Sequence, residues 1–216
     1  ARVPGSIPGP ATIKMYKIIE NFSPYYIRFK HQGIEEVIQF AKEKLKTFDL
    51  NGELSVFQRK LNLEDSKKFL NLLPYKDKFE FQKDRIAFII TKPNTRHNVH
   101  IDKGSISINY GIEIKDNLCK TNFYESNSIE NSYPLGAFNW NDNNNKVLLD
   151  EKEFDKSPVS PVKSFTQREG ECILFNTDIY HDFNNSSPNK RIILTLRASP
   201  PDRYNFYQSR KMLFGF

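Results

Sequence analysis

The chain has 216 residues, of which 38% are hydrophobic and 13% aromatic, and its formal net charge at pH 7 is +6. This length allows one sizeable hydrophobic core and does not require a second domain. The mild positive excess permits an anionic partner but lacks the concentrated basic stripe of a dedicated nucleic-acid face, and no run of about 18 apolar residues predicts a membrane span.

The N-terminal segment, residues 1–14, is rich in proline, glycine and small residues and is followed by Met15. We expect this segment to be a remnant of an expression vector or a flexible arm outside the fold. Residues 15–216 are expected to form a single domain with three parts. These parts are a helical N-terminal part (about 15–75), a β-rich core (about 79–199) and a C-terminal extension (200–216).

Two helices are predicted before the β-rich core. From Gly33 to Phe48, apolar residues recur at the spacing of an amphipathic helix. A second helix is predicted from Leu63 to Leu73, because Asp65 stands near its start and Pro74 follows its end. A short β-prone segment, Tyr25 to Phe29, precedes both helices.

From Phe79 onward, β-branched and aromatic runs alternate with Asn, Gly, Pro and Asp. No helical pattern intervenes, so antiparallel sheets are favoured over βαβ units. The expected fold class is mainly β with N-terminal helices, in the form of a double-sheet, cupin-like jelly roll. The runs predicted as strands are Arg85–Thr91, Ser105–Ile114, Cys119–Tyr124, Lys146–Leu149, Ser164–Thr166, Cys172–Phe175 and Arg191–Ala198.

The two cysteines, Cys119 and Cys172, stand far apart and have no CxxC spacing. The sequence therefore has no zinc-ribbon or dithiol redox signature. A reducing, cytoplasmic location is the expectation, because no secretion signal is recognisable. Cys172 lies in an apolar run and is predicted to be a core residue.

A candidate metal site begins with His100 and Asp102, which follow the apolar strand Arg85–Thr91. Residues two apart on an extended backbone point to the same face, so this imidazole and this carboxylate can reach one ion. His181, which follows the run Cys172–Phe175, is the candidate third ligand. Two imidazoles and one carboxylate on one face of an ion leave three adjacent positions open, which suits Fe(II) and does not by itself exclude zinc.

The other two histidines are expected to lie outside this site. His97 is three residues from His100, and three residues along a strand reverse the face. His97 is therefore predicted to stand behind the metal ligands or at the surface. His31 lies between Lys30 and Gln32 and is predicted to be exposed to solvent.

Arg191 opens the apolar strand Arg191–Ala198, ten residues after His181. A buried arginine needs an anionic partner, because leaving a buried charge unpaired costs several kcal/mol of folding free energy. A bidentate pair with the distal carboxylate of 2-oxoglutarate would provide that partner. The alternative is a salt bridge to a protein acid such as Glu113 or Asp182.

Several short motifs of the β-rich core carry a resemblance to a known family. They are His100-Ile-Asp102, Ser107-Ile-Asn109, Thr121-Asn-Phe-Tyr124 and Leu174–His181, followed by Arg191. In this order they resemble the Fe(II)/2-oxoglutarate-dependent dioxygenase superfamily, and in particular its small stand-alone hydroxylase-like members, over about residues 79–199.

The resemblance implies a double-stranded β-helix in which His100, Asp102 and His181 bind the iron and form the catalytic group. The implied cofactors are Fe(II), 2-oxoglutarate as co-substrate and O2, with ascorbate as a supporting reductant. The implied products from the co-substrate are succinate and CO2. The implied co-substrate contacts are Arg191, Asn109, Thr195 and Arg197.

Three functions stay open at this point. The first is hydroxylation of a C–H bond in a peptide side chain, an amino acid or another small molecule, because Asp102 is a carboxylate that halogenating relatives generally lack. The second is oxidative demethylation of nucleic acid. The spacing of Arg191 and Arg197 resembles that of the AlkB-like branch of the superfamily, although Ile193 stands where that branch has Asn. The third is a cupin-type domain that is non-catalytic or independent of 2-oxoglutarate. No membrane partner is expected, and the sequence predicts neither the substrate nor the oligomeric state.

Overall fold

The computed structural model describes seven stretches of the chain. They are residues 15–97, 99–102, 106–125, 138–140, 146–148, 160–198 and 205–216. The expectations for residues 1–14 and for 200–204 of the C-terminal extension lie outside the described residues.

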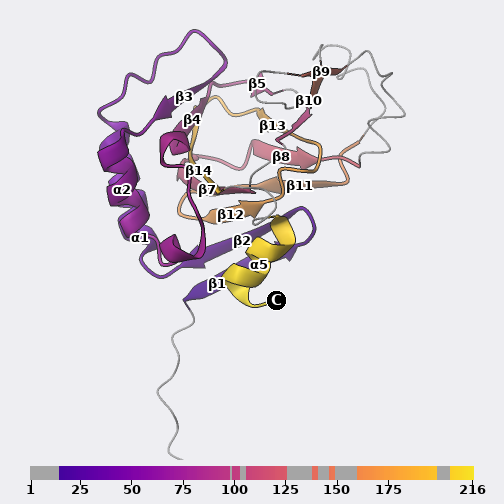
Figure 1. Cartoon of the computed structure of the whole chain (residues 1–216). Coiled ribbons are helices and arrows are strands. Elements are labelled where there is room, and N and C mark those ends of the chain that lie inside the picture. The colour runs from indigo at the N-terminus through magenta and orange to yellow at the C-terminus, as the bar shows by residue number, and fades with distance from the viewer. Residues whose placement is uncertain are drawn as a thin grey trace, which may run out of the picture.

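Two antiparallel sheets form the body of the molecule (Figure 1). The first sheet runs in the order β1 (Tyr16–Phe22), β2 (Tyr26–His31), β12 (Cys172–Phe175), β7 (Ile106–Glu113), β14 (Arg191–Ala198), β4 (Ala87–Thr91) and β3 (Val56–Lys60). The second sheet runs in the order β11 (Lys163–Thr166), β8 (Cys119–Phe123), β13 (His181–Asn185), β6 (His100–Ile101), β10 (Lys146–Leu148) and β9 (Phe138–Trp140), and β5 (Thr95–Arg96) pairs with β13.

Neighbouring strands within each sheet come from distant parts of the chain. In the first sheet β12 lies between β2 and β7, and β14 lies between β7 and β4. The chain passes repeatedly from one sheet to the other, which is the winding of a jelly roll or double-stranded β-helix. The mainly β fold class predicted from strand spacing is confirmed, and the two sheets enclose a space that both can line.

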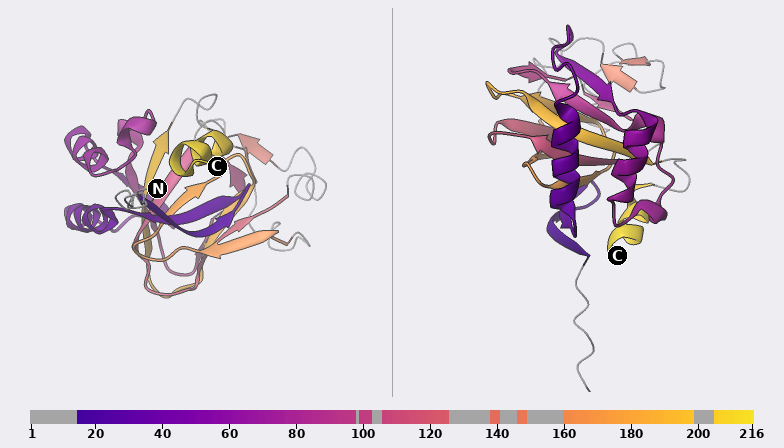
Figure 2. Two further views of the ribbon diagram at one scale, coloured as in Figure 1. Left: turned by 90° about the horizontal axis from the view of Figure 1, so that it is seen from below. Right: turned by 90° about the vertical axis from the view of Figure 1, so that its left-hand side faces the viewer.

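Two helices cover the outer face of the first sheet (Figure 2). They are α1 (Ile34–Leu45) and α2 (Leu63–Asn71), so both predicted helices are confirmed and each ends two or three residues early. The side chain of Asn62 caps α2 by accepting the backbone N–H of Asp65 at 2.8 Å. Among the described residues, no helix is long and apolar enough to cross a membrane.

A C-terminal helix, α5 (Phe206–Phe214), packs on the same core. Asn205 and Gln208 form a reciprocal capping box at its start, and Gly215 ends it in a left-handed conformation with φ of 84°. This helix contacts β12 from the outer side of the first sheet. Two short 3-10 turns, η1 (Lys76–Lys78) and η2 (Lys83–Arg85), are the other helical elements of the described residues.

His31 is buried, so the prediction that it is exposed to solvent was wrong. It ends β2 with 4% of its surface exposed, and it shares with Ile27 and Phe29 the face of that strand that packs against the helices. Its Nε2 lies 2.8 Å from the Tyr110 hydroxyl, which also contacts the Tyr75 hydroxyl. Burial lowers the pKa of His31, so the imidazole in this core is neutral.

Candidate metal centre

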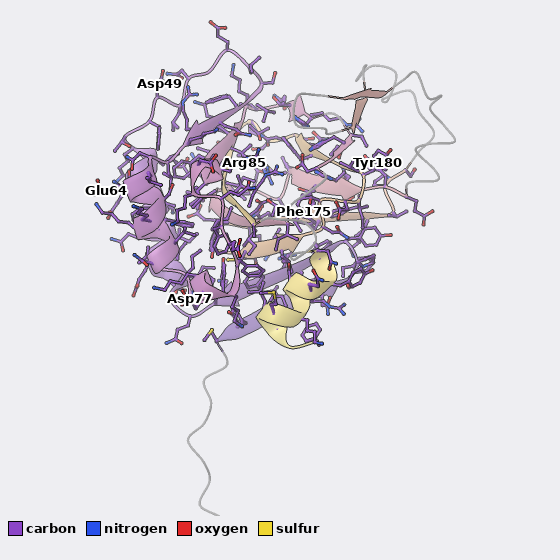
Figure 3. All side chains as sticks on the ribbon, in the orientation of Figure 1. Asp49, Glu64, Asp77, Arg85, Phe175 and Tyr180 are labelled. Atoms are coloured by element: carbon purple, nitrogen blue, oxygen red, sulfur yellow. The ribbon has the colours of Figure 1, made fainter. Side chains whose placement is uncertain are left out.

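A pocket lies between the inner faces of the two sheets. Its volume is about 70 Å³, which is enough to admit water or a small ligand. Its apolar wall includes Phe165, Phe175, Phe183 and Ile193. Phe175 lies amid the strands in Figure 3, whereas Glu64 lies at the periphery. Phe175 and His181 are both buried, so the pocket is interior, and apart from Ile89 its remaining lining is polar.

His100, Asp102 and His181 converge in this region. Each residue offers one ligand atom, and these atoms all lie within 4.8 Å of one another. The register of β13 against β6 places His181 directly opposite His100, and residues directly opposite one another project to the same face. Asp102 follows β6 by one residue, and its backbone N–H donates to the carbonyl of Thr177 at 2.9 Å. The structure thus brings together the three residues that the sequence singled out.

Hydrogen bonding and burial keep His181 in the state that a metal ligand needs. Its Nδ1–H donates to the carbonyl of Ile179 at 2.7 Å, which leaves the lone pair of Nε2 for a ligand bond. Burial, reinforced by the charge of His100, lowers the pKa of His181 to about 3. The imidazole is therefore neutral at physiological pH.

Asp102 is held in its ionised form. Burial alone would raise the pKa of Asp102, but Arg197 and the two histidines bring it well below its usual range. Arg197 donates from Nη2 to Asp102 Oδ2 at 2.8 Å. The resemblance assigned Arg197 to the co-substrate, and the structure places it against the carboxylate of the candidate metal site.

Arg191 lies in the same pocket and is almost completely buried, with 5% of its surface exposed. Burial lowers the pKa of Arg191 to about 10, so the guanidinium stays charged at neutral pH. Its Nη2 donates to Gln167 Oε1 at 3.3 Å, and its guanidinium carbon lies 5.4 Å from the centre of the Phe183 ring. Within the part of the chain that the structure describes, no carboxylate forms a salt bridge with Arg191.

The protein acids considered as alternative partners of Arg191 do not pair with it. Asp182 is fully buried and accepts hydrogen bonds from Arg96 at 3.1 Å, from Asn122 at 2.6 Å and from Tyr124 at 3.0 Å. Glu113 makes no described salt bridge to Arg191 either. The alternative of a protein salt bridge is therefore wrong for these two residues, and the buried charge remains available to a ligand.

Polar groups of the first sheet line the pocket together with the two arginines. Asn109 of β7 is opposite Thr195 of β14 in the strand register. The Ser107 hydroxyl lies 3.0 Å from Asn109 Oδ1 and 2.9 Å from Thr195 Oγ1. Asn109 and Thr195, both singled out in the sequence, thus lie beside the candidate site and are linked through one hydroxyl group.

His97 lies beside the three candidate ligands without joining them. Its ring centre is 4.8 Å from that of His100, and its ring stacks on Phe183 at 4.8 Å. This place agrees with the prediction that His97 stands behind the metal ligands.

Sequence reasoning missed Phe183, which lines the pocket, and Gln167, whose amide oxygen accepts a hydrogen bond from Arg191. A signal existed for Phe183, because it is two residues after His181 and therefore shares its face of β13. No sequence signal marks Gln167, which follows the short strand β11 by one residue.

No family model matches this sequence, and no curated protein matches it. Solved structures do match. HygX from Streptomyces hygroscopicus, in a structure with nickel, 2-oxoglutarate and hygromycin B bound, aligns with a TM-score of 0.53 and 10% identity over 81% of this chain and 82% of that one. EvdO2 from Micromonospora carbonacea var. aurantiaca aligns with a TM-score of 0.51 and 11% identity over 82% of this chain and 87% of that one. At such identities the likeness shows a shared fold.

Proposed function

We propose that this protein is an Fe(II)- and 2-oxoglutarate-dependent dioxygenase. One observation carries the proposal: a group of two histidines and one aspartate stands at a buried pocket, and the pocket also holds an arginine that has no carboxylate partner among the described residues. The first group suits a divalent metal with open coordination positions. The arginine suits a carboxylate of a small ligand, and one dicarboxylate can engage both.

The residues present fit the two groups that the proposal requires. His181 is neutral with Nε2 available, and Asp102 is ionised, as metal binding demands. Asp102, His181 and Arg191 line the same pocket, so one short dicarboxylate could reach both the metal group and the guanidinium. HygX, which shares the fold, holds nickel and 2-oxoglutarate in its crystal structure, and this supports the same pair of ligands here.

The protein's own part in the reaction is binding, orientation and exclusion of water. His100, Asp102 and His181 would hold the metal from one side, and Arg191 would pair with the distal carboxylate of 2-oxoglutarate. When bound, Fe(II) and 2-oxoglutarate with O2 supply an oxidant for a substrate C–H bond and yield succinate and CO2. The apolar wall around Phe175 limits the access of bulk water to this space.

We propose hydroxylation as the outcome, because Asp102 fills the carboxylate position of the metal group. A small-molecule substrate is supported by the hygromycin B found in HygX, while a peptide side chain or an amino acid would undergo the same chemistry.

The test is an anaerobic titration of the protein with Fe(II) and 2-oxoglutarate, followed by visible absorption. The wild-type protein should develop the weak visible charge-transfer band of a chelated 2-oxoglutarate when both are present, and His100→Ala and Asp102→Ala should lose it. His97→Ala is the matched control, because His97 adjoins the site without belonging to the three-residue group. A wild type without the band, or a band that survives both ligand substitutions, would refute the proposed function. A cupin-type site independent of 2-oxoglutarate would instead bind metal and be indifferent to Arg191→Ala.

A further inference from the structure

We infer that Gln167 is a positioning residue for Arg191 and that its neutral amide sets the affinity of the pocket for 2-oxoglutarate. The inference rests on the proposed function. Gln167 is 2% exposed and follows β11 of the second sheet, whereas Arg191 opens β14 of the first. The contact between the two side chains therefore joins the two sheets at the arginine end of the pocket.

Both ends of the Gln167 amide are in use, and this determines its orientation. Nε2 donates to the backbone carbonyl of Asn109 at 3.1 Å, and a carbonyl can only accept. The amide oxygen must therefore face Arg191, whose Nη2 donates to it at 3.3 Å. One N–H of the guanidinium is fixed in this way, and the guanidinium plane is fixed with it.

The groups that contact Arg191 from the described part of the chain are neutral. Gln167 contributes an amide oxygen, and Phe183 contributes the face of its ring at 5.4 Å. Neither group cancels the positive charge, so the full charge stays available to an anionic ligand. A carboxylate at position 167 would have nearly the same shape as the amide and would compete directly with the carboxylate of the co-substrate.

The backbone around Gln167 is fixed by a close approach to Gly111 of β7. A Cβ atom at position 111 would lie 2.2 Å from the carbonyl oxygen of Arg168, which is far inside contact distance. The Gly111 N–H donates to the carbonyl of Glu171, and the Gly170 N–H donates to that of Gly111, both at 3.0 Å. Glycine at 111 thus allows the segment that carries Gln167 to lie directly on the strand that carries its acceptor.

The test compares Gln167→Leu with the nearly isosteric Gln167→Glu. The leucine variant loses the orientation of Arg191 and should bind 2-oxoglutarate about tenfold more weakly than wild type. The glutamate variant supplies a permanent internal partner and should bind at least about 100-fold more weakly. The second carboxylate oxygen of the glutamate variant would face the carbonyl oxygen of Asn109, to which Nε2 of Gln167 donates in the wild type, and this repulsion offsets the stability gained by pairing the guanidinium.

A purely structural role of Gln167 would lower the 2-oxoglutarate affinity of both variants alike, whereas a charge at position 167 should separate the two affinities by about tenfold. Metal affinity, titrated separately, should stay unchanged in both variants, and Gln58→Glu on exposed β3 is the matched control for an added charge. Gly111→Ala should weaken 2-oxoglutarate binding in the same direction as Gln167→Leu, because it displaces the segment from outside the pocket.

Two failures are distinguishable. The positioning role is overturned, and the proposed function stands, if the wild type binds 2-oxoglutarate and both Gln167 variants bind it as tightly as the wild type. The same holds if the affinity of the glutamate variant equals or exceeds that of the leucine variant. If the wild type itself does not bind 2-oxoglutarate, the proposed function fails and the positioning role fails with it.

Discussion

Replacing Arg191 by methionine should stabilise the protein without ligand while removing its affinity for 2-oxoglutarate. Burial lowers the pKa of Arg191 to about 10, and at 1.36 kcal/mol per pKa unit the charged guanidinium costs the folded state about 3 kcal/mol. Its contacts with Gln167 and Phe183 offset about 1–2 kcal/mol of that cost. Methionine fills a similar volume without a charge. A net gain of about 1–2 kcal/mol should raise the melting temperature by about 2–8 °C.

The effect of Arg191→Met on ligand binding has the opposite sign. Leaving the distal carboxylate of 2-oxoglutarate without its buried partner should cost about 3–5 kcal/mol, which is a loss of about two to four orders of magnitude in affinity. Thermal unfolding without ligand and titration of the charge-transfer band under anaerobic conditions measure the two effects. Arg85→Met, at an exposed arginine, is the matched control. A variant that melts below the wild type and still binds 2-oxoglutarate with wild-type affinity would refute the reasoning.

Three further predictions concern the surroundings of the site and the core. Arg197→Met removes the donor 2.8 Å from Asp102 Oδ2 and should weaken metal binding about 10–100-fold in a metal titration; an unchanged affinity would contradict this role. His31→Gln should reduce the loss of stability on acidification. Because burial lowers the pKa of His31 in the folded state, the unfolded state binds more protons below about pH 6.5, and stability falls there by up to about 1.4 kcal/mol per pH unit. Urea unfolding at neutral and mildly acidic pH measures this, and parallel pH profiles of the two proteins would exclude it. Tyr124→Phe removes a hydrogen bond of 3.0 Å to buried Asp182 and should cost about 1.5–3 kcal/mol of unfolding free energy, so an unchanged urea midpoint would disprove its contribution.

The candidate ligands could be singled out from the sequence because part of their geometry is local. His100 and Asp102 are two residues apart, and the alternation of an extended chain places them on one side whatever surrounds them. The position of His181 depends on the pairing of β13 with β6, which is a contact between residues distant in the chain. Sequence order suggested His181 as the third ligand, but only the register places it opposite His100.

Where the prediction was wrong or silent, the deciding contacts are also distant ones. The polar neighbours of His31 suggested exposure, yet its partner Tyr110 comes from β7 and was not visible from local sequence. The strand β13 has the sequence HDFNN, whose polar residues hide its strand character from a search for apolar alternation. The helix α5 was predictable in part, because Asn205 and Gln208 have the spacing of a capping box.

The two faces of β13 explain how a polar strand can be both buried and well ordered. On one face His181 meets the candidate metal site, and on the other Asp182 is fully buried. Arg96 and Asn122, from β5 and β8 on either side of β13, both donate to that carboxylate. Because adjacent residues of one strand share a rigid backbone, the hydrogen bonds that fix Asp182 also fix the direction of His181. The hydrogen bonds of Asp182 on one face of β13 thus help to orient His181 on the other face toward a bound metal.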